Sequence, residues 1–308
     1  MIKVFGHITP DTDATCSAIV YAWYLREHRQ QDAQPFVLGP ISREATYVLE
    51  HFALQVPALL ELQAGDTVVI VDTNNPEELP ETIQEAKIIG IVDHHKLFGG
   101  LSTAEPIPVV MQPLACTATV IWQEFQKAGI GSLPQEIAGI MLASILSDTL
   151  KFTSPTTTQF DRAAAEALTS VAGVNIETLA AGMFAAKSDL TGLSPKSILT
   201  SDSKIFTIGG KKLRVSSLET TNPAIALGMK HELLPAMEEL KVEEQLDGLF
   251  FFVVDILQSS ATLMVPSQFE REVAEKGFAQ HFEGEVLELP GVVSRKKQII
   301  PALEAALT

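Results

Sequence analysis

The chain has 308 residues, of which 46% are hydrophobic and 19% are charged, and its formal net charge at pH 7 is −16. A chain of this length exceeds one ordinary hydrophobic core, so two domains are expected. The negative charge repels polyanions and argues against nonspecific nucleic-acid binding, and no apolar run approaches the roughly 20 residues of a membrane span, which predicts a soluble protein without a membrane partner.

The first half of the chain alternates between strand and helix patterns. Strands are predicted at residues 2–7, 35–39, 66–75 and 86–96. Helices are predicted at residues 13–28, where Asp13 would be the N-cap, and at residues 42–52, 116–129, 134–148, 158–173 and 176–186. This alternation predicts a doubly wound, mainly parallel sheet covered on both faces.

A Ser/Gly/Pro segment at residues 188–202 breaks the helical periodicity and is the candidate linker. After it, residues 203–219 predict a hairpin that turns at Gly209 and Gly210, residues 226–245 predict one helix, and residues 248–257 and 260–267 predict strands. We therefore expect an α/β chain with an N-terminal domain at residues 1–188, a hinge linker at 189–195 and a smaller, mixed-sheet domain at 196–308.

The N-terminus enters a strand-like pattern without the basic region, apolar core and cleavage site of a secretory signal. Cys16 and Cys116 both lie among apolar or small residues. This setting is typical of buried, reduced thiols, so we predict no disulfide and a cytoplasmic protein.

Polar residues gather where the predicted strands end. In "GHITPDTDA", His7, Asp11 and Asp13 can converge on a metal ion only if the chain reverses, and Thr9 and Pro10 favour such a turn. A Pro-Asp turn followed by an Asp N-cap is the commoner explanation of such a stretch by itself. Asp72 in "IVDTNN" follows another strand, where an aspartate often only starts a turn.

"IVDHHK" is a stronger signal. Adjacent histidines allow His94 to face a metal and His95 to face a substrate, while Asp93 orients a ring from behind; a lone Asp-His pair is more often a buried hydrogen bond. Asp148 in "ILSDTLKF" ends an apolar helix, where the helix dipole disfavours a carboxylate unless a cation is near. An exposed C-terminal residue is the structural alternative.

The carboxyl ends of parallel strands meet at one edge of a sheet, so these stretches are expected to converge. Imidazole and carboxylate together suit manganese, cobalt or zinc, and the set is large enough for two ions that share a carboxylate. The candidate metal ligands are His7, Asp11, Asp13, Asp72, His94 and Asp148.

Five stretches, "GHITPDTDA", "VDTNN", "VDHHK", "SDTLKF" and "SRKKQIIP", together resemble the manganese- or cobalt-dependent inorganic pyrophosphatases of family II, in the DHH phosphoesterase superfamily. The resemblance spans the chain from His7 to Pro301. It implies hydrolysis of pyrophosphate to two orthophosphates by a water that bridges two Mn²⁺ or Co²⁺ ions in each subunit. It also implies magnesium delivered with the substrate and a homodimer formed through the N-terminal domain.

Residue roles follow from the same resemblance. His7 and Asp11 would bind one ion, and Asp72 would bridge both as a catalytic residue. The second ion would be bound by Asp13, His94 and Asp148. His95, also catalytic, would face the substrate as a proton donor. The second domain would close the cleft over the active site and hold the phosphates through Lys204, Arg295 and Lys296. Thr9 stands where such families often have Asn.

Two other functions compete with this interpretation. A phosphodiesterase acting on short oligonucleotides or cyclic dinucleotides would share the first four motifs, but it needs stacking surfaces for bases, and no nucleotide-gripping motif is visible. A metal-binding regulatory protein on a degenerate hydrolase scaffold would require a broken ligand set, and none is broken. The basic "SRKKQ" run, which otherwise indicates a solvated surface or a nucleic-acid patch, favours the pyrophosphatases.

Overall fold

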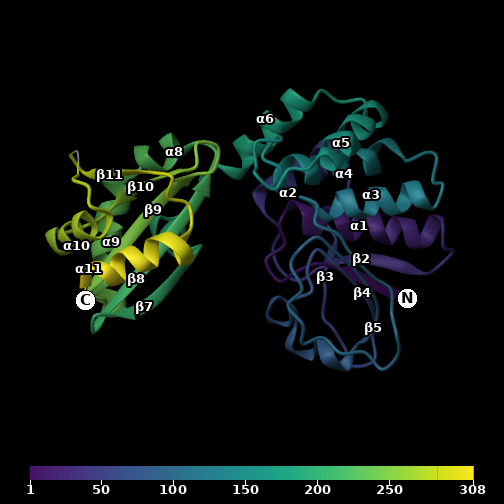
Figure 1. Cartoon of the computed structure of the whole chain (residues 1–308), viewed down its shortest axis with the longest axis horizontal. Helices are drawn as coiled ribbons and strands as arrows, with labels where there is room; N and C mark the ends of the chain where they lie inside the picture. The colour runs from purple at the N-terminus through teal and green to yellow at the C-terminus, as the bar shows by residue number, and fades with distance from the viewer. Residues whose placement is uncertain (283, 308) are drawn as a thin grey trace. The chain divides into compact units, whose positions relative to one another are not determined.

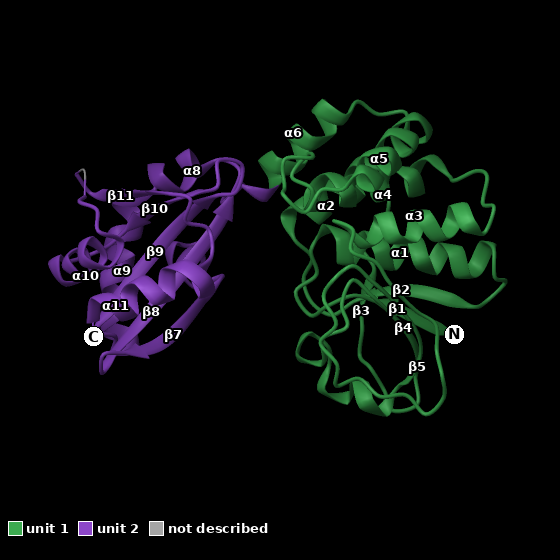
Figure 2. Ribbon diagram, in the orientation of Figure 1, with its two compact units in different colours: residues 1–186 green, residues 187–308 purple. Residues whose placement is uncertain are grey.

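The computed structural model describes residues 1–282 and 284–307. The chain divides into two compact units, Met1–Ala186 and Lys187–Thr308 (Figure 2). Each unit has its own sheet and its own hydrophobic clusters.

The sheet of the first unit has the order β3-β2-β1-β4-β5-β6, and every strand pair in it is parallel. Its strands are β1 (Ile2–Phe5), β2 (Ala33–Val37), β3 (Ala58–Leu59), β4 (Thr67–Val71), β5 (Lys87–Asp93) and β6 (Val109–Met111). The order runs outward from β1 on one side and from β4 on the other, as in a doubly wound sheet, so the predicted fold class is confirmed. In such sheets ligands bind where the order reverses, which here is the edge after β1 and β4.

The α-helices of the first unit all contribute to one core cluster, and Figure 1 shows α1, α3, α4 and α5 stacked beside the sheet. They are α1 (Thr12–Glu27), α2 (Arg43–His51), α3 (Thr117–Lys127), α4 (Gln135–Asp148), α5 (Gln159–Ala172) and α6 (Ile176–Lys187). The cluster on the other face is built mainly from strand residues, from Leu79, which follows the 3₁₀ turn η1 (Pro76–Glu78), and from Ile83 in the 3₁₀ turn η2 (Glu81–Glu85). Helices therefore line one face of the sheet, and short turns close the other.

The second unit has a mixed sheet of order β11-β10-β9-β8-β7, in which β8 and β9 are parallel and the other pairs antiparallel. Its strands are β7 (Ser203–Ile208), β8 (Lys211–Thr220), β9 (Gly248–Asp255), β10 (Ser260–Met264) and β11 (Val286–Pro290). Its helices are α7 (Pro195–Thr200), α8 (Pro223–Gly228), α9 (Lys230–Glu244), α10 (Gln268–Phe278) and α11 (Ile300–Leu307), with a π-helical turn, η3 (Arg295–Ile299), before the last.

The central strand β9 is buried on both faces. Phe250 and Phe252 belong to one core cluster, whereas Phe251 and Val253 belong to the other. Successive side chains of a strand point to opposite faces, so this apolar run supplies both cores at once. The predicted mixed sheet is confirmed.

The hairpin of β7 and β8 turns at Gly209 and Gly210, as predicted, and both glycines have positive φ angles, 56° and 73°. A two-residue hairpin turn of this kind favours glycine because L side chains are strained there. The helix predicted at residues 226–245 is instead two helices, α8 and α9, which meet at Met229 after Gly228. The segment predicted as irregular contains α7, which Ser194 caps and Pro195 begins.

Within the described residues, no single helix is both long and apolar enough to cross a membrane. Only α5 and α6 taken together meet those two criteria, and they are bent by 101°.

A buried ion pair ties the second unit together. The Glu270 carboxylate in α10 is fully buried, accepts a hydrogen bond from Leu249 N at 3.1 Å and from the Ser267 hydroxyl, and lies 2.7 Å from Lys241 Nζ of α9. Replacing Glu270 by alanine removes the buried partner of a nearly buried ammonium group, which then keeps only the more distant, half-exposed carboxylate of Glu238 at 3.6 Å. We expect the free energy of unfolding to fall by about 3–5 kcal/mol, measured by calorimetry on the whole protein.

The matched control is Glu243→Ala, because Glu243 pairs with Lys196 at 2.6 Å on the surface, where both side chains are more than half exposed. It should change the free energy of unfolding by no more than about 1 kcal/mol. Fluorescence is unsuitable as the readout, since both tryptophans, Trp23 and Trp122, lie in the first unit. Equal destabilisation by the two variants would contradict the role assigned to Glu270.

Candidate metal centre

The loop after β1 leads directly into α1. Asp11, with an extended backbone, caps this helix, and its carboxylate accepts a hydrogen bond from Ala14 N at 2.9 Å. The prediction that Asp13 is the N-cap is therefore wrong: the helix begins at Thr12, and Asp13 lies in its first turn. By local sequence, either aspartate could be the N-cap of α1. Contacts of Asp13 with a helix distant in sequence decide that Asp11 takes this position.

Those contacts come from the N-terminus of α3. The carboxylate of Asp13, fully buried, accepts hydrogen bonds from Thr117 N at 2.6 Å, Ala118 N at 3.2 Å and Ser17 Oγ at 2.8 Å. Free backbone N–H groups at a helix N-terminus stabilise an anion. The position of the Asp13 carboxylate is thus fixed by a helix that is distant in sequence.

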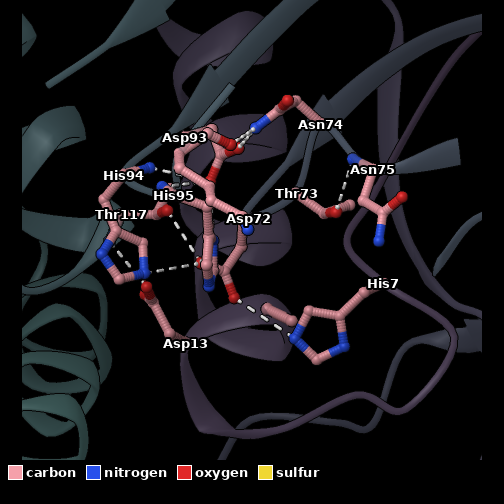
Figure 3. A network of polar contacts seen from close by, with 12 residues as sticks. His7, Asp13, Asp72, Thr73, Asn74, Asn75, Asp93, His94, His95 and Thr117 are labelled. Atoms are coloured by element: carbon pink, nitrogen blue, oxygen red, sulfur yellow. Dashed lines mark hydrogen bonds and ion pairs between the residues drawn. The ribbon is translucent and has the colours of Figure 1, made fainter. Parts of the chain in front are cut away.

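Asp72 lies at the centre of the site. It follows β4 with a φ of 60°, a left-handed conformation that few residues other than glycine adopt and that aspartate tolerates better than most. Its Oδ2 lies 3.5 Å from His7 Nε2, and its Oδ1 lies 3.4 Å from His94 Nε2 (Figure 3). Thr117 Oγ1 also donates to Oδ1 at 2.9 Å. One buried carboxylate therefore faces two imidazoles, one with each oxygen.

The ring of His94 is oriented by the backbone. Its Nδ1 lies 3.1 Å from the carbonyl oxygen of Leu114, which only accepts, so Nδ1 carries a proton and Nε2 is directed toward Asp72 and Asp148. The Nε2 of His94 lies 3.9 Å from Asp148 Oδ2, at the end of α4. This is the arrangement expected of a histidine that offers Nε2 to a metal.

The neighbouring His95 is held differently. Its Nδ1 lies 2.9 Å from Asp93 Oδ1, which also accepts from the backbone N–H groups of His94 and His95. Asn74 donates to the other oxygen of Asp93 at 2.6 Å. The His95 side chain is 45% exposed. The two histidines of the pair thus have separate orientations, one inward and one toward solvent.

Among the described residues, three sets of donors have atoms within 4.8 Å of one another. The sets are His7, Asp11 and Asp72; Asp13, His94 and Asp148; and Asp72, His94 and His95. Two of them share Asp72 and two share His94. The structure brings together all six candidate metal ligands and His95.

The ionisable side chains at this site strongly shift one another's pKa values. Burial works to lower the pKa of His7 and of His94, yet the surrounding carboxylates raise them to about 10 and about 9. Burial and the repulsion of Asp72 raise the pKa of Asp13 to about 7. Although burial opposes it, hydrogen bonds from His7 and His94 lower the pKa of Asp72.

Protons on the two histidines thus balance buried carboxylates that are otherwise crowded together. A divalent cation would supply the same positive charge and take the same oxygen and nitrogen donors. The donor chemistry, with imidazole and carboxylate mixed, therefore fits manganese or cobalt. Cys16 and Cys116 are both buried and free, and neither belongs to a donor set.

The predicted phosphate-binding residues lie in the second unit. Arg295 begins η3 and is held at the start of β7, where its Nη2 donates to Asp202 Oδ1 at 2.6 Å and its Nη1 to the Asp202 carbonyl at 2.9 Å. Lys204 in β7 and Lys296 in η3 are both exposed. Within this unit, Arg295 therefore lies beside the start of the strand that contains Lys204.

Sequence patterns did not identify Thr117 or Asn74. Thr117 contacts Asp13 and Asp72, and Asn74 contacts Asp93 and donates to the Lys96 carbonyl at 2.9 Å. The only local signal for Thr117 is its place at the start of a helix. Its role comes from residues more than 40 positions away in sequence.

The first unit is a doubly wound parallel sheet, and three overlapping sets of imidazole and carboxylate donors lie at the edge where its strand order reverses. A mixed-sheet unit follows it, so the fold is that of a two-domain α/β protein with candidate metal-binding residues in its first unit. The model of the DHH family N-terminal domain matches residues 1–145, and that of the DHHA2 domain matches residues 181–306. The chain belongs to the family II inorganic pyrophosphatases of the DHH superfamily.

Relatives match over the whole chain. A probable manganese-dependent inorganic pyrophosphatase from Deinococcus radiodurans is 43% identical, over 99% of this chain and 98% of its own. One from Archaeoglobus fulgidus is 37% identical over the same shares. A crystal structure assigned to family II, from Methanococcus jannaschii, is 36% identical with a TM-score of 0.71 and covers 100% of this chain and 99% of its own.

Proposed function

We propose that this protein hydrolyses inorganic pyrophosphate to two orthophosphates, with two manganese or cobalt ions in each subunit and magnesium bound to the substrate. The observation that carries the proposal is the position of Asp72, whose two oxygens face His7 and His94. Relatives named as manganese-dependent inorganic pyrophosphatases, 35–43% identical, support the choice of metal and of substrate.

The proposed ligands of the first ion are His7, Asp11 and Asp72. The second ion is assigned to Asp13, His94 and Asp148, again with Asp72. When bound, paired ions of this kind activate water for in-line attack and neutralise charge on the phosphates. The chain's own contribution is to fix the donors: the α3 N-terminus holds Asp13, and the Leu114 carbonyl fixes the ring of His94.

His95 is the proposed proton donor to the leaving phosphate. Its Nδ1 is hydrogen-bonded to Asp93, which leaves Nε2 for the substrate. The hydrogen bond to Asp93 raises the pKa of His95. A raised pKa keeps the imidazole protonated to higher pH than usual, which suits a group that gives up a proton.

The second unit is proposed to supply phosphate contacts. Arg295, Lys296 and Lys204 are assigned to the phosphate that leaves, because guanidinium and ammonium groups bind phosphate oxygens strongly. We propose that this unit closes over the metal centre, with residues 189–195 as the hinge between domains at 1–188 and 196–308. Closure would exclude water and complete the site.

Two further assignments belong to this proposal. We propose a homodimer formed through the N-terminal domain, as the family implies. We also propose a cytoplasmic location, and the two buried free cysteines are consistent with a reducing compartment.

Phosphate release from magnesium pyrophosphate tests the function. Protein stripped with a chelator is reloaded separately with manganese, cobalt, zinc or magnesium, and a dinucleotide phosphodiester is the parallel substrate. We expect manganese and cobalt to restore hydrolysis of pyrophosphate and the diester to stay intact. Hydrolysis of the diester alone would assign the protein to the phosphodiesterases, and inactivity on both would favour a metal-binding regulatory protein on a degenerate hydrolase scaffold.

A further inference from the structure

Glu44, near the start of α2, is a buried acidic residue that the proposed function does not use. Its exposed fraction is 2%, and it belongs to none of the three donor sets. An acidic side chain is seldom buried this deeply unless it makes specific polar contacts. The contacts of Glu44 therefore indicate what it does.

Two buried hydroxyl groups donate to the same oxygen of Glu44. Thr12 Oγ1 lies 2.8 Å from Oε2, and Ser147 Oγ lies 2.6 Å from it. The second distance falls in the range of hydrogen bonds from a hydroxyl to an ionised oxygen. Such bonds are stronger than those between neutral groups, and both are shielded from water, since Thr12 and Ser147 are also buried.

The two donors belong to the segments that carry the proposed metal ligands. Thr12 stands between Asp11 and Asp13 at the start of α1, and Ser147 directly precedes Asp148 at the end of α4. Glu44 thus joins two helix termini that are far apart in sequence. Asp13 and Asp148, which belong to one donor set, are each one residue away from a hydroxyl that Glu44 holds.

The start of α2 is itself fixed to the same loop. Ser42 caps α2 by accepting from Ala45 N at 3.0 Å, and Ser42 N donates to the Pro10 carbonyl at 3.2 Å. Glu44 is in the first turn, where the helix dipole favours a negative charge. These contacts fix the start of α2, and with it the backbone of Glu44, independently of the hydroxyls that donate to its side chain.

We propose that Glu44 is a positioning residue of the metal centre, which holds Asp13 and Asp148 at the separation that one shared cation requires. Without such a link, two carboxylates that converge on one point repel each other. The inference rests on the proposed metal centre, and it assigns Glu44 to the ion bound by Asp13, His94 and Asp148 rather than to the ion bound by His7 and Asp11.

Manganese binding to chelator-stripped protein tests this role without reference to activity. Stepwise dissociation constants come from isothermal titration, and the electron paramagnetic resonance spectrum separates coupled ion pairs from single ions. Glu44→Ala is expected to weaken one of the two binding steps by about 10–100-fold, the usual effect of losing an outer partner of a metal ligand. At two equivalents of manganese it should show single-ion signals where the wild type shows a coupled pair.

Further variants separate this role from a general loss of stability. Ser147→Ala, which deletes only one hydroxyl, should weaken the same step by a smaller factor, and it should have no added effect in the Glu44→Ala background. Glu44→Gln keeps an acceptor oxygen and the side-chain shape, so its binding should fall between wild type and Glu44→Ala. Glu50→Gln, an exposed change on the same helix, is the matched control and should bind both ions normally.

The outcomes distinguish the two proposals. Wild-type binding of two manganese ions together with normal binding by Glu44→Ala and Ser147→Ala would overturn the role of Glu44 and leave the metal centre intact. Equal weakening of both steps would overturn the assignment to one ion. Failure of the wild type to bind manganese at all would overturn the proposed function itself. Should Glu44→Ala not fold, Ser147→Ala and Glu44→Gln provide the same comparison.

Discussion

Replacing Asp72 by alanine is expected to abolish measurable pyrophosphate hydrolysis and to weaken manganese binding in both steps. The two oxygens of Asp72 face His7 at 3.5 Å and His94 at 3.4 Å, so this one side chain belongs to the coordination of both proposed ions. Losing an outer partner of a ligand costs about 10–100-fold in metal affinity, and losing a shared direct ligand should exceed that at each site. Isothermal titration of the stripped protein with manganese measures both steps.

Two comparisons make the Asp72 result specific. Asp32→Ala removes an exposed carboxylate from the same unit and should leave binding and turnover unchanged. Thr117→Val removes the hydroxyl that donates to Asp72 at 2.9 Å but keeps the carboxylate, so it should have a smaller effect than Asp72→Ala. If Asp72→Ala still bound two ions with wild-type affinity, the assignment of Asp72 as the bridging ligand would be wrong.

The location of this site at one edge of the sheet could be predicted from the sequence, because its residues directly follow the predicted strands. Runs of β-branched and apolar residues before Asp72 and Asp93 indicate buried parallel strands, and parallel strands end at one edge. Once His7 and these two aspartates are placed there, their convergence needs no knowledge of distant contacts. The order of strands, with β1 beside β4, then brings the first loop against Asp72.

Other features depend on contacts that no local pattern contains. Asp11 and Asp13 are equally good caps by sequence, and the choice is made by the N-terminus of α3, whose amides bind Asp13. Glu44 reads as an ordinary first-turn acid of an amphipathic helix until Ser147, about 100 positions later, is found beside it. The hydroxyl donors of this site are therefore visible only in three dimensions.

In the second unit the errors have a different origin. The two helices predicted as one share a continuous apolar and charged pattern across Gly228 and Met229, and a single glycine inside such a pattern lowers helix stability by only about 1 kcal/mol. The helix α10 and the strand β11 were not predicted at all. Both have a regular pattern, since α10 is amphipathic and β11 alternates buried and exposed side chains, and their apolar side chains are buried in the same core cluster as those of β9 and β10.

Replacing His95 by glutamine is expected to lower kcat by about 10²–10⁴-fold, the usual contribution of a positioned acid or base. His95 is 45% exposed and turns its Nδ1 to Asp93, so its Nε2 is free to face a substrate. Glutamine retains a hydrogen-bonding side chain of similar reach but cannot give up a proton at neutral pH. Steady-state kinetics on magnesium pyrophosphate, with the manganese sites saturated, measures the change.

Metal binding by the same variant decides what His95 does. Its ring atoms also lie within reach of Asp72 and His94, so a ligand role is the alternative to proton donation. As a proton donor, His95 can be replaced with little change in manganese affinity, whereas a ligand cannot. A large loss of affinity in His95→Gln would therefore contradict the assignment, and normal kinetics in the exposed control His51→Gln would show that the effect belongs to this histidine. Asp93→Asn should reproduce part of the loss in kcat, because Asp93 holds the ring of His95 in place.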